Sequence, residues 1–336
     1  MKLALIGYGN VGRALARLLR QKRREFPFTV TGIHTLRHGT AIQSSGLPLE
    51  PAFGPRAASV EEFLEQARAD VAVELTTLNP VDGEPAISHI RAAFARGMHV
   101  ATANKGPVAH AFADLREEAV RAGVGFRFES AVMDGAPVFN LWRHCLPGVR
   151  VLGFTGALNS TSKVIIEAME RGGSFEDGMS RARAMGITEA GGAFDVEGWD
   201  SAAKTAALAN VLMDARTTPQ KVSTRGITRL TPERLRAMAQ RGKTVRLISR
   251  GRRNGAAVSL RVRAEVLDRS DILASAPGAS NVILFHTDLM GTFGTVSIEP
   301  GVEQTAYGVF SDLVALAHDT EPRPEGAVPL KPAPPS

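Results

Sequence analysis

The first twelve residues, MKLALIGYGNVG, constrain the fold more than any other segment of the chain. Residues 3–6 form an apolar run that predicts a buried strand, and Gly7, Gly9 and Gly12 follow it at once. Apolar residues then recur at helical spacing through residue 19. Strand, glycine turn and helix in this order predict the first unit of a parallel α/β sheet that holds a dinucleotide.

Each glycine of this G-x-G-x-x-G pattern has a physical role. Gly7 allows a tight turn, Gly9 lets the main chain approach a pyrophosphate, and Gly12 lets the helix pack closely on the strand. The helix N-terminus adds unpaired N–H groups and the positive end of the helix dipole. The predicted cofactor-binding residues of this turn are Gly7, Gly9, Asn10, Val11 and Gly12.

Strands and helices continue to alternate after this turn, which predicts a parallel sheet with helices on both faces. Ser59, followed three residues later by Glu62, marks one helix start. The further predicted strands are 29–35, 70–75, 98–103 and 124–130, and the predicted helices are 59–69, 86–96 and 109–122. We therefore expect an α/β fold that begins with a Rossmann NAD(P)-binding domain over residues 1–135.

The pattern changes after about residue 135 and predicts a second, α+β domain over 136–300 with a mixed or antiparallel sheet. Its predicted strands are 149–158, 258–267, 281–290 and 294–300, and its predicted helices are 161–170, 175–185, 200–213 and 232–239. An amphipathic helix at 305–317 lies in a C-terminal segment, 301–320. The Pro-rich residues 321–336 predict a disordered tail.

Composition argues against several partners. The formal charge is +6, but acidic residues are interspersed with the basic ones and aromatic residues make up only 6%, so no nucleic-acid partner is expected. No apolar run reaches the roughly 20 residues that span a bilayer, and the N-terminal run ends without a signal-peptide pattern, so no membrane partner is expected. The single cysteine, Cys145, forms no internal disulfide, which favours a reducing, cytoplasmic location.

The end of the second predicted strand bears on the choice between NAD and NADP. An acid there often binds the ribose 2′-hydroxyl of NAD, but the segment IHTLRHGT has none. Arg37 could accommodate the 2′-phosphate of NADP, or it could be an exposed loop residue. The sequence therefore favours NADP over NAD by a small margin.

Several longer blocks resemble the homoserine dehydrogenase family, in the family's order and over most of the chain. The two most specific are TANKGP at 102–107 and DVEGWDSAAK at 195–204. The wider blocks are 73–109, 129–139, 158–165, 186–213 and 301–313. The resemblance implies a Rossmann domain, a second domain for substrate binding and dimerisation, and a C-terminal helix that returns to the first domain. We expect the short form, without the ACT regulatory domain of longer members.

The resembled family interconverts L-homoserine and L-aspartate 4-semialdehyde with NAD or NADP, in threonine, methionine and isoleucine biosynthesis. The match implies that Lys204 is the general acid/base at the reacting oxygen and that Lys105 lies between nicotinamide and substrate. It also implies that Glu189 holds the amino-acid substrate, with Asp195 and Asp200 as acidic neighbours.

Further residues take their expected roles from the same resemblance. Thr76 and Asn104 would line the nicotinamide end of the cofactor, and Gly301 and Thr305 would approach it from the returning helix. The family also implies a homodimer. A monovalent cation such as Na⁺ would be held by oxygens, largely main-chain carbonyls, of Glu129, Val132, Asp134 and Ala136.

Three departures from the family pattern leave alternatives open. Gly191–Gly192 stands where the family usually has Asp-Pro, Pro300–Gly301 is what remains of a glycine run, and 159–163 reads NSTSK rather than NGTTN. A paralogous dehydrogenase of another amino or hydroxy acid is the main alternative, and a non-catalytic NAD(P)-binding regulator is the second. Because a regulator needs no proton donor, the presence of both lysines and Glu189 argues against it.

The pair Asp200 and Lys204 has two interpretations, since a helix places residues four apart on one face. The residues alone favour an exposed ion pair worth about 0.3–0.5 kcal/mol. However, the following run TAALANVLM is almost wholly apolar, which predicts a buried helix. A lysine at its ordinary pKa of about 10.4 is a poor base, and burial or a second ammonium lowers a lysine pKa toward the useful range. Together with the resemblance, this favours a catalytic amine.

Overall fold

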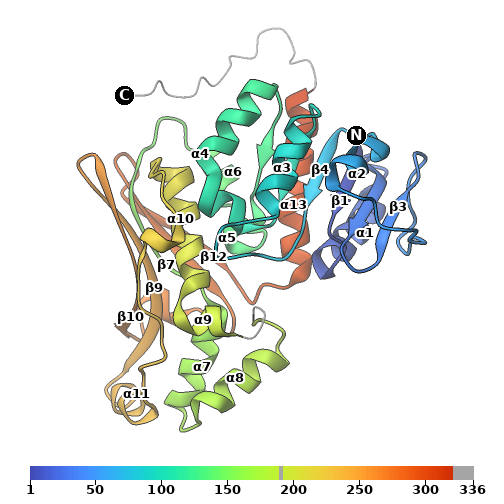
Figure 1. Cartoon of the computed structure of the whole chain (residues 1–336). Coiled ribbons are helices and arrows are strands. Elements are labelled where there is room, and N and C mark those ends of the chain that lie inside the picture. The colour runs from blue at the N-terminus through green and yellow to red at the C-terminus, as the bar shows by residue number, and fades with distance from the viewer. Residues whose placement is uncertain (189–191, 321–336) are drawn as a thin grey trace.

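The computed structural model describes residues 1–188 and 192–320 of the 336-residue chain. Within these residues the chain forms two six-stranded sheets. Figure 1 shows the N-terminal sheet with its helices at the right and the second sheet at the left. The last helix, α13 (Val302–Thr320), runs from the second sheet back to the N-terminal sheet, where it packs against α1.

The N-terminal sheet has the strand order β3-β2-β1-β4-β5-β6. All neighbours pair in parallel except β2 and β3, which form an antiparallel edge that the sequence pattern did not predict. The strands are β1 (Lys2–Ile6), β2 (Thr29–Thr35), β3 (Gly39–Ile42), β4 (Val71–Glu74), β5 (His99–Thr102) and β6 (Phe126–Arg127). The strand order reverses beside β1, since β2 and β3 lie on one side of it and β4, β5 and β6 lie on the other. The crevice between β1 and β4, at this switch point, is therefore the expected ligand position.

Alternating residues of β1 decide which helices cover which face of this sheet. Leu3 and Leu5 pack with α1 (Asn10–Lys22) and α13, whereas Ala4 and Ile6 share a core with the opposite helices. These opposite helices are α2 (Val60–Ala67), α3 (Ala86–Phe94) and α4 (Lys105–Ala122). The predicted cap of α2 is present, since Ser59 Oγ accepts the Glu62 N–H at 3.2 Å.

Two boundaries differ from the sequence prediction. The helix expected from residue 109 begins at Lys105, because the Asn104 side chain accepts the Gly106 N–H at 2.9 Å and caps α4. The strand expected over 124–130 is limited to two residues, and Ser130 already begins the short helix α5 (Ser130–Met133).

The second sheet has the order β12-β11-β7-β9-β10-β8 and is antiparallel except between β10 and β8, as a mixed sheet predicts. Its strands are β7 (Val151–Ala157), β8 (Ser223–Thr224), β9 (Lys243–Asn254), β10 (Ala257–Asp268), β11 (Asn281–Thr287) and β12 (Thr292–Ser297). Strand β9 was not predicted from the sequence, because the many basic residues in KTVRLISRGRRN obscure the alternation of apolar and polar side chains.

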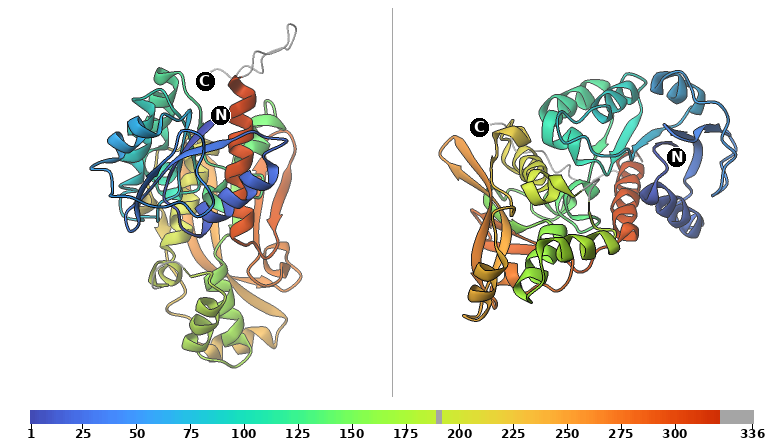
Figure 2. Two further views of the ribbon diagram at one scale, coloured as in Figure 1. Left: turned by 90° about the vertical axis from the view of Figure 1, so that its right-hand side faces the viewer. Right: turned by 60° about the horizontal axis from the view of Figure 1, so that its bottom comes forward.

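Helices cover the side of the second sheet that faces the N-terminal sheet (Figures 1 and 2). The longer ones are α7 (Ser160–Glu170), α8 (Phe175–Ala184), α10 (Trp199–Met213) and α11 (Pro232–Ala239). The short ones are α6 (Phe139–His144) and α9 (Ala193–Glu197), with a 3₁₀ turn at Pro219–Lys221. The short helix α12 (Ile272–Ser275) packs instead through Leu273 on Ile248 and Val282, which point to the opposite face from Val245 and Leu247. Over the described residues, no helix has the length and apolar character that crossing a membrane requires.

Candidate active site

The glycine turn is built as the motif predicts. Gly7 has φ +99°, and a Cβ at this position would lie 2.7 Å from the Leu75 carbonyl oxygen, so only glycine fits. Gly9 is open, since a Cβ there would meet no atom within 4 Å. The turn therefore leaves the main chain at the start of α1 accessible to a phosphate group.

Thr76 and Asn104 connect this turn to the edge of the sheet where β4 and β5 end. A Cβ on Gly7 would lie 3.2 Å from the Thr76 main-chain nitrogen, so the glycine turn and Thr76 are neighbours. Asn104 Nδ2 donates to the Thr76 carbonyl at 3.2 Å, and Lys105 follows Asn104 as the first residue of α4. The predicted nicotinamide-end residues thus lie between the glycine turn and Lys105.

The two predicted catalytic lysines meet at a single carboxylate. Lys105 Nζ lies 3.1 Å from Asp200 Oδ1, and Lys204 Nζ lies 3.3 Å from Asp200 Oδ2. Lys204 also donates to the Leu158 carbonyl at 2.7 Å. Asp200 is only 3% exposed, so Asp200 and Lys204 are not the exposed ion pair that the residues alone favoured. Residues 99 positions apart along the chain are brought to one point by the docking of α10 against α4.

Asn159 organises the carboxylates behind the lysines. Its Nδ2 donates to Asp195 Oδ1 at 2.8 Å and to Asp200 Oδ2 at 3.0 Å. Burial raises the pKa of Asp200, but the charges of Lys204 and Lys105 and the hydrogen bond from Asn159 outweigh burial and hold this pKa well below its usual range. Asp200 is therefore a permanent anion that fixes both ammonium groups.

This role of Asn159 was not predicted from the sequence, where the residue is only the first of the segment 159–163 that departs from the family pattern. The available signal was local: Asn159 Oδ1 also accepts the Ser162 N–H at 2.7 Å, which is the geometry of a helix cap for α7. A capping asparagine is common, so its contact with two aspartates followed only from the tertiary structure.

These groups line a cavity of about 460 Å³ between the two sheets. Its lining includes Lys105, Lys204, Asp195 and Asp200, together with residues of α5 and of the segment that enters α13. The predicted residues Gly301, Thr305 and Asp134 are among them. The cavity thus combines amines, carboxylates and the returning helix.

The predicted cation residues lie in one short segment, 129–136, where the Glu129 carboxylate is already engaged. Glu129 accepts main-chain N–H groups of Val138, of Phe139 at 2.9 Å and of Asn140 at 2.5 Å, and so caps α6. Burial raises the pKa of Glu129, and these three hydrogen bonds oppose the rise. In the described part, no group of three or more His, Cys, Asp or Glu side chains could hold a metal ion. The predicted site on oxygens of Glu129, Val132, Asp134 and Ala136, largely main-chain carbonyls, stays a prediction.

Arg37 does not line this cavity. It is exposed in the turn between β2 and β3, and β2 pairs directly with β1, the strand that leads into the glycine turn. Glu189 and Gly191 lie outside the described residues, so their predicted roles at the substrate loop are not addressed by the structure.

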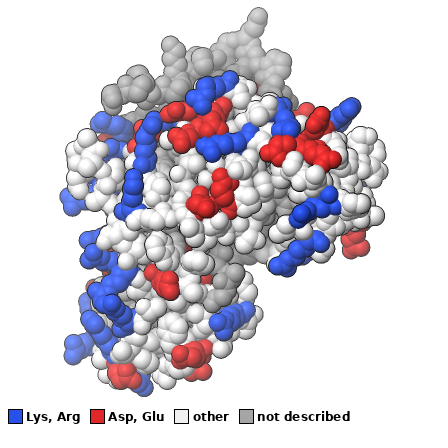
Figure 3. Space-filling view, viewed as in Figure 1, with Lys and Arg blue, Asp and Glu red and all other residues white. Residues whose placement is uncertain are grey.

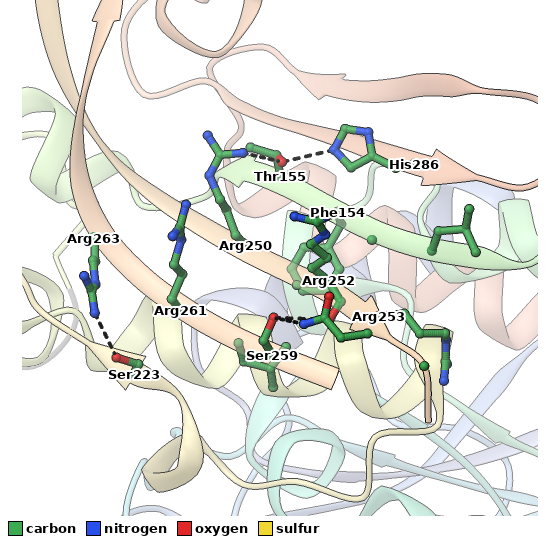
Figure 4. A pocket seen from close by; sticks show the side chains of 16 residues that line it. Phe154, Thr155, Ser223, Arg250, Arg252, Arg253, Ser259, Arg261, Arg263 and His286 are labelled. Carbon is green, nitrogen blue, oxygen red and sulfur yellow. Dashed lines mark hydrogen bonds between the residues drawn. The ribbon is translucent and has the colours of Figure 1, made fainter. Parts of the chain in front are cut away.

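A larger cavity, of about 990 Å³, lies on the outer face of the second sheet and shares no lining residue with the lysine cavity. Figure 4 shows Arg250 and Arg261 beside each other there, with Thr155 accepting from Arg250 at 3.0 Å. Figure 3 shows Lys and Arg side chains along this left margin of the molecule. We assign the chemistry to the smaller cavity, because it holds the paired amines.

A glycine turn for a dinucleotide and a pair of amines beside it meet the needs of hydride transfer coupled to proton transfer, and they define the class as a nicotinamide-dependent dehydrogenase. The family model described as "Homoserine dehydrogenase, NAD binding domain" matches residues 7–129, and the model described as "Homoserine dehydrogenase" matches residues 137–314. The chain therefore belongs to the homoserine dehydrogenase family, as the sequence blocks predicted.

Individual relatives agree with this assignment. The chain is similar to an NAD(+)-dependent homoserine dehydrogenase of Pseudomonas canavaninivorans, with 35% identity over 94% of this chain and 96% of the relative. It is 34% identical to a homoserine dehydrogenase of Methanocaldococcus jannaschii, over 96% of this chain and all of the relative. Among solved structures, a putative homoserine dehydrogenase from Archaeoglobus fulgidus superposes with a TM-score of 0.84 at 29% identity, covering 94% of this chain and 99% of that one.

Proposed function

We propose that this protein catalyses the NAD(P)-dependent interconversion of L-homoserine and L-aspartate 4-semialdehyde. The observation that carries the proposal is the pair of amines, Lys105 and Lys204, held by the two oxygens of Asp200 in one cavity. The glycine turn next to this cavity fits the nicotinamide cofactor.

The protein's own task is to bind the amino acid and to move one proton. When bound, the cofactor supplies the hydride acceptor or donor. Lys204, oriented by the Leu158 carbonyl and Asp200, accepts the hydroxyl proton during oxidation in its neutral amine form, and in its ammonium form it gives the proton back during reduction. Lys105 places its positive charge at the same substrate oxygen and stabilises the charge that develops there. Glu189, Asp195 and Asp200 complete the substrate site.

The choice between NAD and NADP rests on Arg37. Its exposed guanidinium, in the turn after β2, supports contact with a 2′-phosphate, and we propose that NADP is accepted in preference to NAD. The Pseudomonas relative is named NAD(+)-dependent, so both cofactors belong in the first assay.

A Na⁺ ion would be held by oxygens of Glu129, Val132, Asp134 and Ala136. Comparing turnover in NaCl with turnover in tetramethylammonium chloride tests this site.

We also infer a cytoplasmic homodimer. The outer face of the second sheet is open, and Val296 of β12 is 44% exposed there, so a second copy fits this face. Light scattering should give twice the chain mass at micromolar concentration. A monomer at that concentration would contradict the inference.

The decisive assay follows the absorbance of reduced cofactor with L-homoserine at alkaline pH, alongside a panel of other amino and hydroxy acids. Lys204→Ala should lower kcat by about 10²- to 10⁴-fold and leave cofactor binding nearly intact, because it removes the proton acceptor. Lys221→Ala, at an exposed lysine outside the cavity, is the matched control. Near-normal turnover of Lys204→Ala would refute the acid/base role.

The same panel separates the alternatives. Turnover of another amino or hydroxy acid at a higher kcat/KM than L-homoserine would favour the paralogous dehydrogenase. Tight cofactor binding with no turnover of any substrate would favour the non-catalytic regulator.

A further inference from the structure

Asn210 is a buried polar residue of α10 that the proposed mechanism does not use, and it is only 4% exposed. Its Nδ2 donates to the main-chain carbonyls of Val108 at 3.1 Å and Ala109 at 3.2 Å, both in α4. The side chain also donates to the Thr217 carbonyl at 3.0 Å and accepts the Thr217 N–H at 2.8 Å. One amide thus joins α10, α4 and the segment that follows α10.

Helix α4 is kinked at the place where Asn210 binds it. Ala111 has φ −136° and ψ 18°, which are not helical values. In a regular helix the carbonyls of Val108 and Ala109 would accept the N–H groups four residues later, which lie beyond Ala111. A side chain that inserts into the hydrogen bonds of a helix is a known cause of such a kink. Asn210 supplies a donor at the kink and so stabilises the bent form of α4.

The segment of α4 before the kink carries one of the two proposed catalytic lysines. Lys105 is the first residue of α4 and lies three and four residues before the two bonded carbonyls, which is about one helical turn. Its Nζ contacts Asp200 of α10 at 3.1 Å. The Asn104 side chain caps the start of this segment by accepting the Gly106 N–H. Asn210 therefore holds the other end of the turn that aims Lys105 at Asp200.

Other groups hold the part of α4 that follows the kink. Arg116 Nη2 lies 3.4 Å from Asp214 Oδ1, and Glu117 Oε1 lies 3.0 Å from Arg216 Nη2, so both ion pairs join this part to the segment after α10.

Loss of the Asn210 amide would leave the buried carbonyls of Val108 and Ala109 without this donor, which is unfavourable. The direct way to recover a donor is a regular helix. Because the later part of α4 is held, straightening would turn the first segment and move Lys105 away from Asp200.

We propose that Asn210 is a positioning residue for the reaction: by holding the kink of α4, it places Lys105 at the reacting oxygen beside Lys204. Asn210 is not among the residues that line the lysine cavity, so it acts through Lys105. A displacement of about 1 Å at a reacting group can lower a rate about 100-fold, which sets the size of the expected effect. The inference rests on the proposed function, because it takes the role of Lys105 from there.

Two substitutions remove the hydrogen bonds in different ways. Asn210→Ala truncates the side chain and puts a strong helix former into α10, whereas Asn210→Leu keeps a side chain of similar size that has no donor. Thr244→Val is the matched control, at a buried threonine of β9 outside the lysine cavity. It also removes buried hydrogen bonds, those to Glu170 and Arg246, and so tests loss of stability alone. Urea unfolding measures the stability of each variant.

The kinetic assay separates slower chemistry from a smaller fraction of folded protein. Titration with reduced cofactor counts the folded sites of the full chain, and kcat with L-homoserine is expressed per site. Both Asn210 variants should lower this kcat by about 10- to 100-fold and keep the KM for the cofactor within about twofold. Thr244→Val should lose stability and keep kcat. Unchanged kcat in both Asn210 variants, or an equal loss of kcat in Thr244→Val, would overturn the inference.

Crystal structures of the two Asn210 variants test the geometry without turnover. They should show α4 closer to a regular helix at Ala111, with Lys105 Nζ displaced beyond the about 4 Å of an ion pair with Asp200. An unchanged contact between Lys105 and Asp200 in both variants would overturn the inference. Wild-type protein that binds the cofactor and turns over no substrate would refute the proposed function, and these structures would still decide whether Asn210 places Lys105.

Discussion

Asp312 of α13 should make the stability of this protein fall as pH rises. The residue is fully buried, and its Oδ2 accepts the Glu129 N–H at 2.7 Å. Burial raises its pKa to about 7; the Glu129 N–H, Arg143 and Asn140 oppose the rise, and the Glu129 charge adds to it. The folded state therefore holds a proton here that the unfolded chain has released at neutral pH.

The size of the effect follows from the two pKa values. The interval from the ordinary value of 3.8 to about 7, at about 1.4 kcal/mol per pKa unit, corresponds to about 4 kcal/mol. The folded pKa is raised, so this stability is fully present below pH 3.8 and is lost as pH rises through about 7. Between pH 5 and pH 9 the contribution to the free energy of unfolding should fall by about 3 kcal/mol.

The assay is urea unfolding at pH 5, 7 and 9, followed by the fluorescence of Trp142, which lies on α6 beside Asn140, and of Trp199. Asp312→Asn should remove most of the pH 5–9 decline. Some decline should remain, since burial also raises the pKa of Glu129. Asp114→Asn, at an exposed aspartate of α4, is the control and should decline like the wild type. If Asp312→Asn kept the full decline, the buried carboxyl would not be its source.

Three further substitutions test the cofactor and substrate ends of the site. Gly7→Ala should weaken cofactor binding at least about tenfold in a fluorescence titration, because its Cβ would lie 2.7 Å from the Leu75 oxygen at φ +99°; unchanged affinity would contradict this. Asn159→Leu should lower kcat/KM at least about tenfold and cost about 2 kcal/mol of stability, since two buried carboxylates lose their shared donor; steady-state kinetics and urea unfolding measure both. Arg37→Ala should raise KM for NADP about tenfold and leave KM for NAD unchanged, and equal changes for both cofactors would exclude a 2′-phosphate contact.

Local patterns were enough to predict the nucleotide turn and most of the first sheet. Few local structures fit the spacing of Gly7, Gly9 and Gly12 after an apolar strand, because each glycine meets a separate steric requirement. The cap at Ser59 and the apolar run after Lys204 were likewise local signals, and the structure has α2 and the buried α10 where they predict them. Family resemblance, rather than periodicity, singled out Lys105 and Lys204 as a pair.

Local patterns failed where the decisive partner is far along the chain. β9 carries basic residues on the outer face of the second sheet, so its strand character depends on β7 and β10 pairing beside it. The outer arginines of β9 are stabilised by cross-strand groups such as Glu265, which accepts from Arg250 at 2.9 Å. No window of a few residues contains that contact.

The sequence by itself determined the elements and the chemical groups: a glycine turn, two amines and a set of aspartates. Only the tertiary structure decided that Asp200 joins both amines, that Asn159 joins Asp200 to Asp195, and that Thr305 holds Asp134 at their cavity. The physical reason is range. Turns and helices are set by neighbours within a few residues, whereas the charge balance of a buried site is set by whichever groups the packing of α4, α7, α10 and α13 brings together.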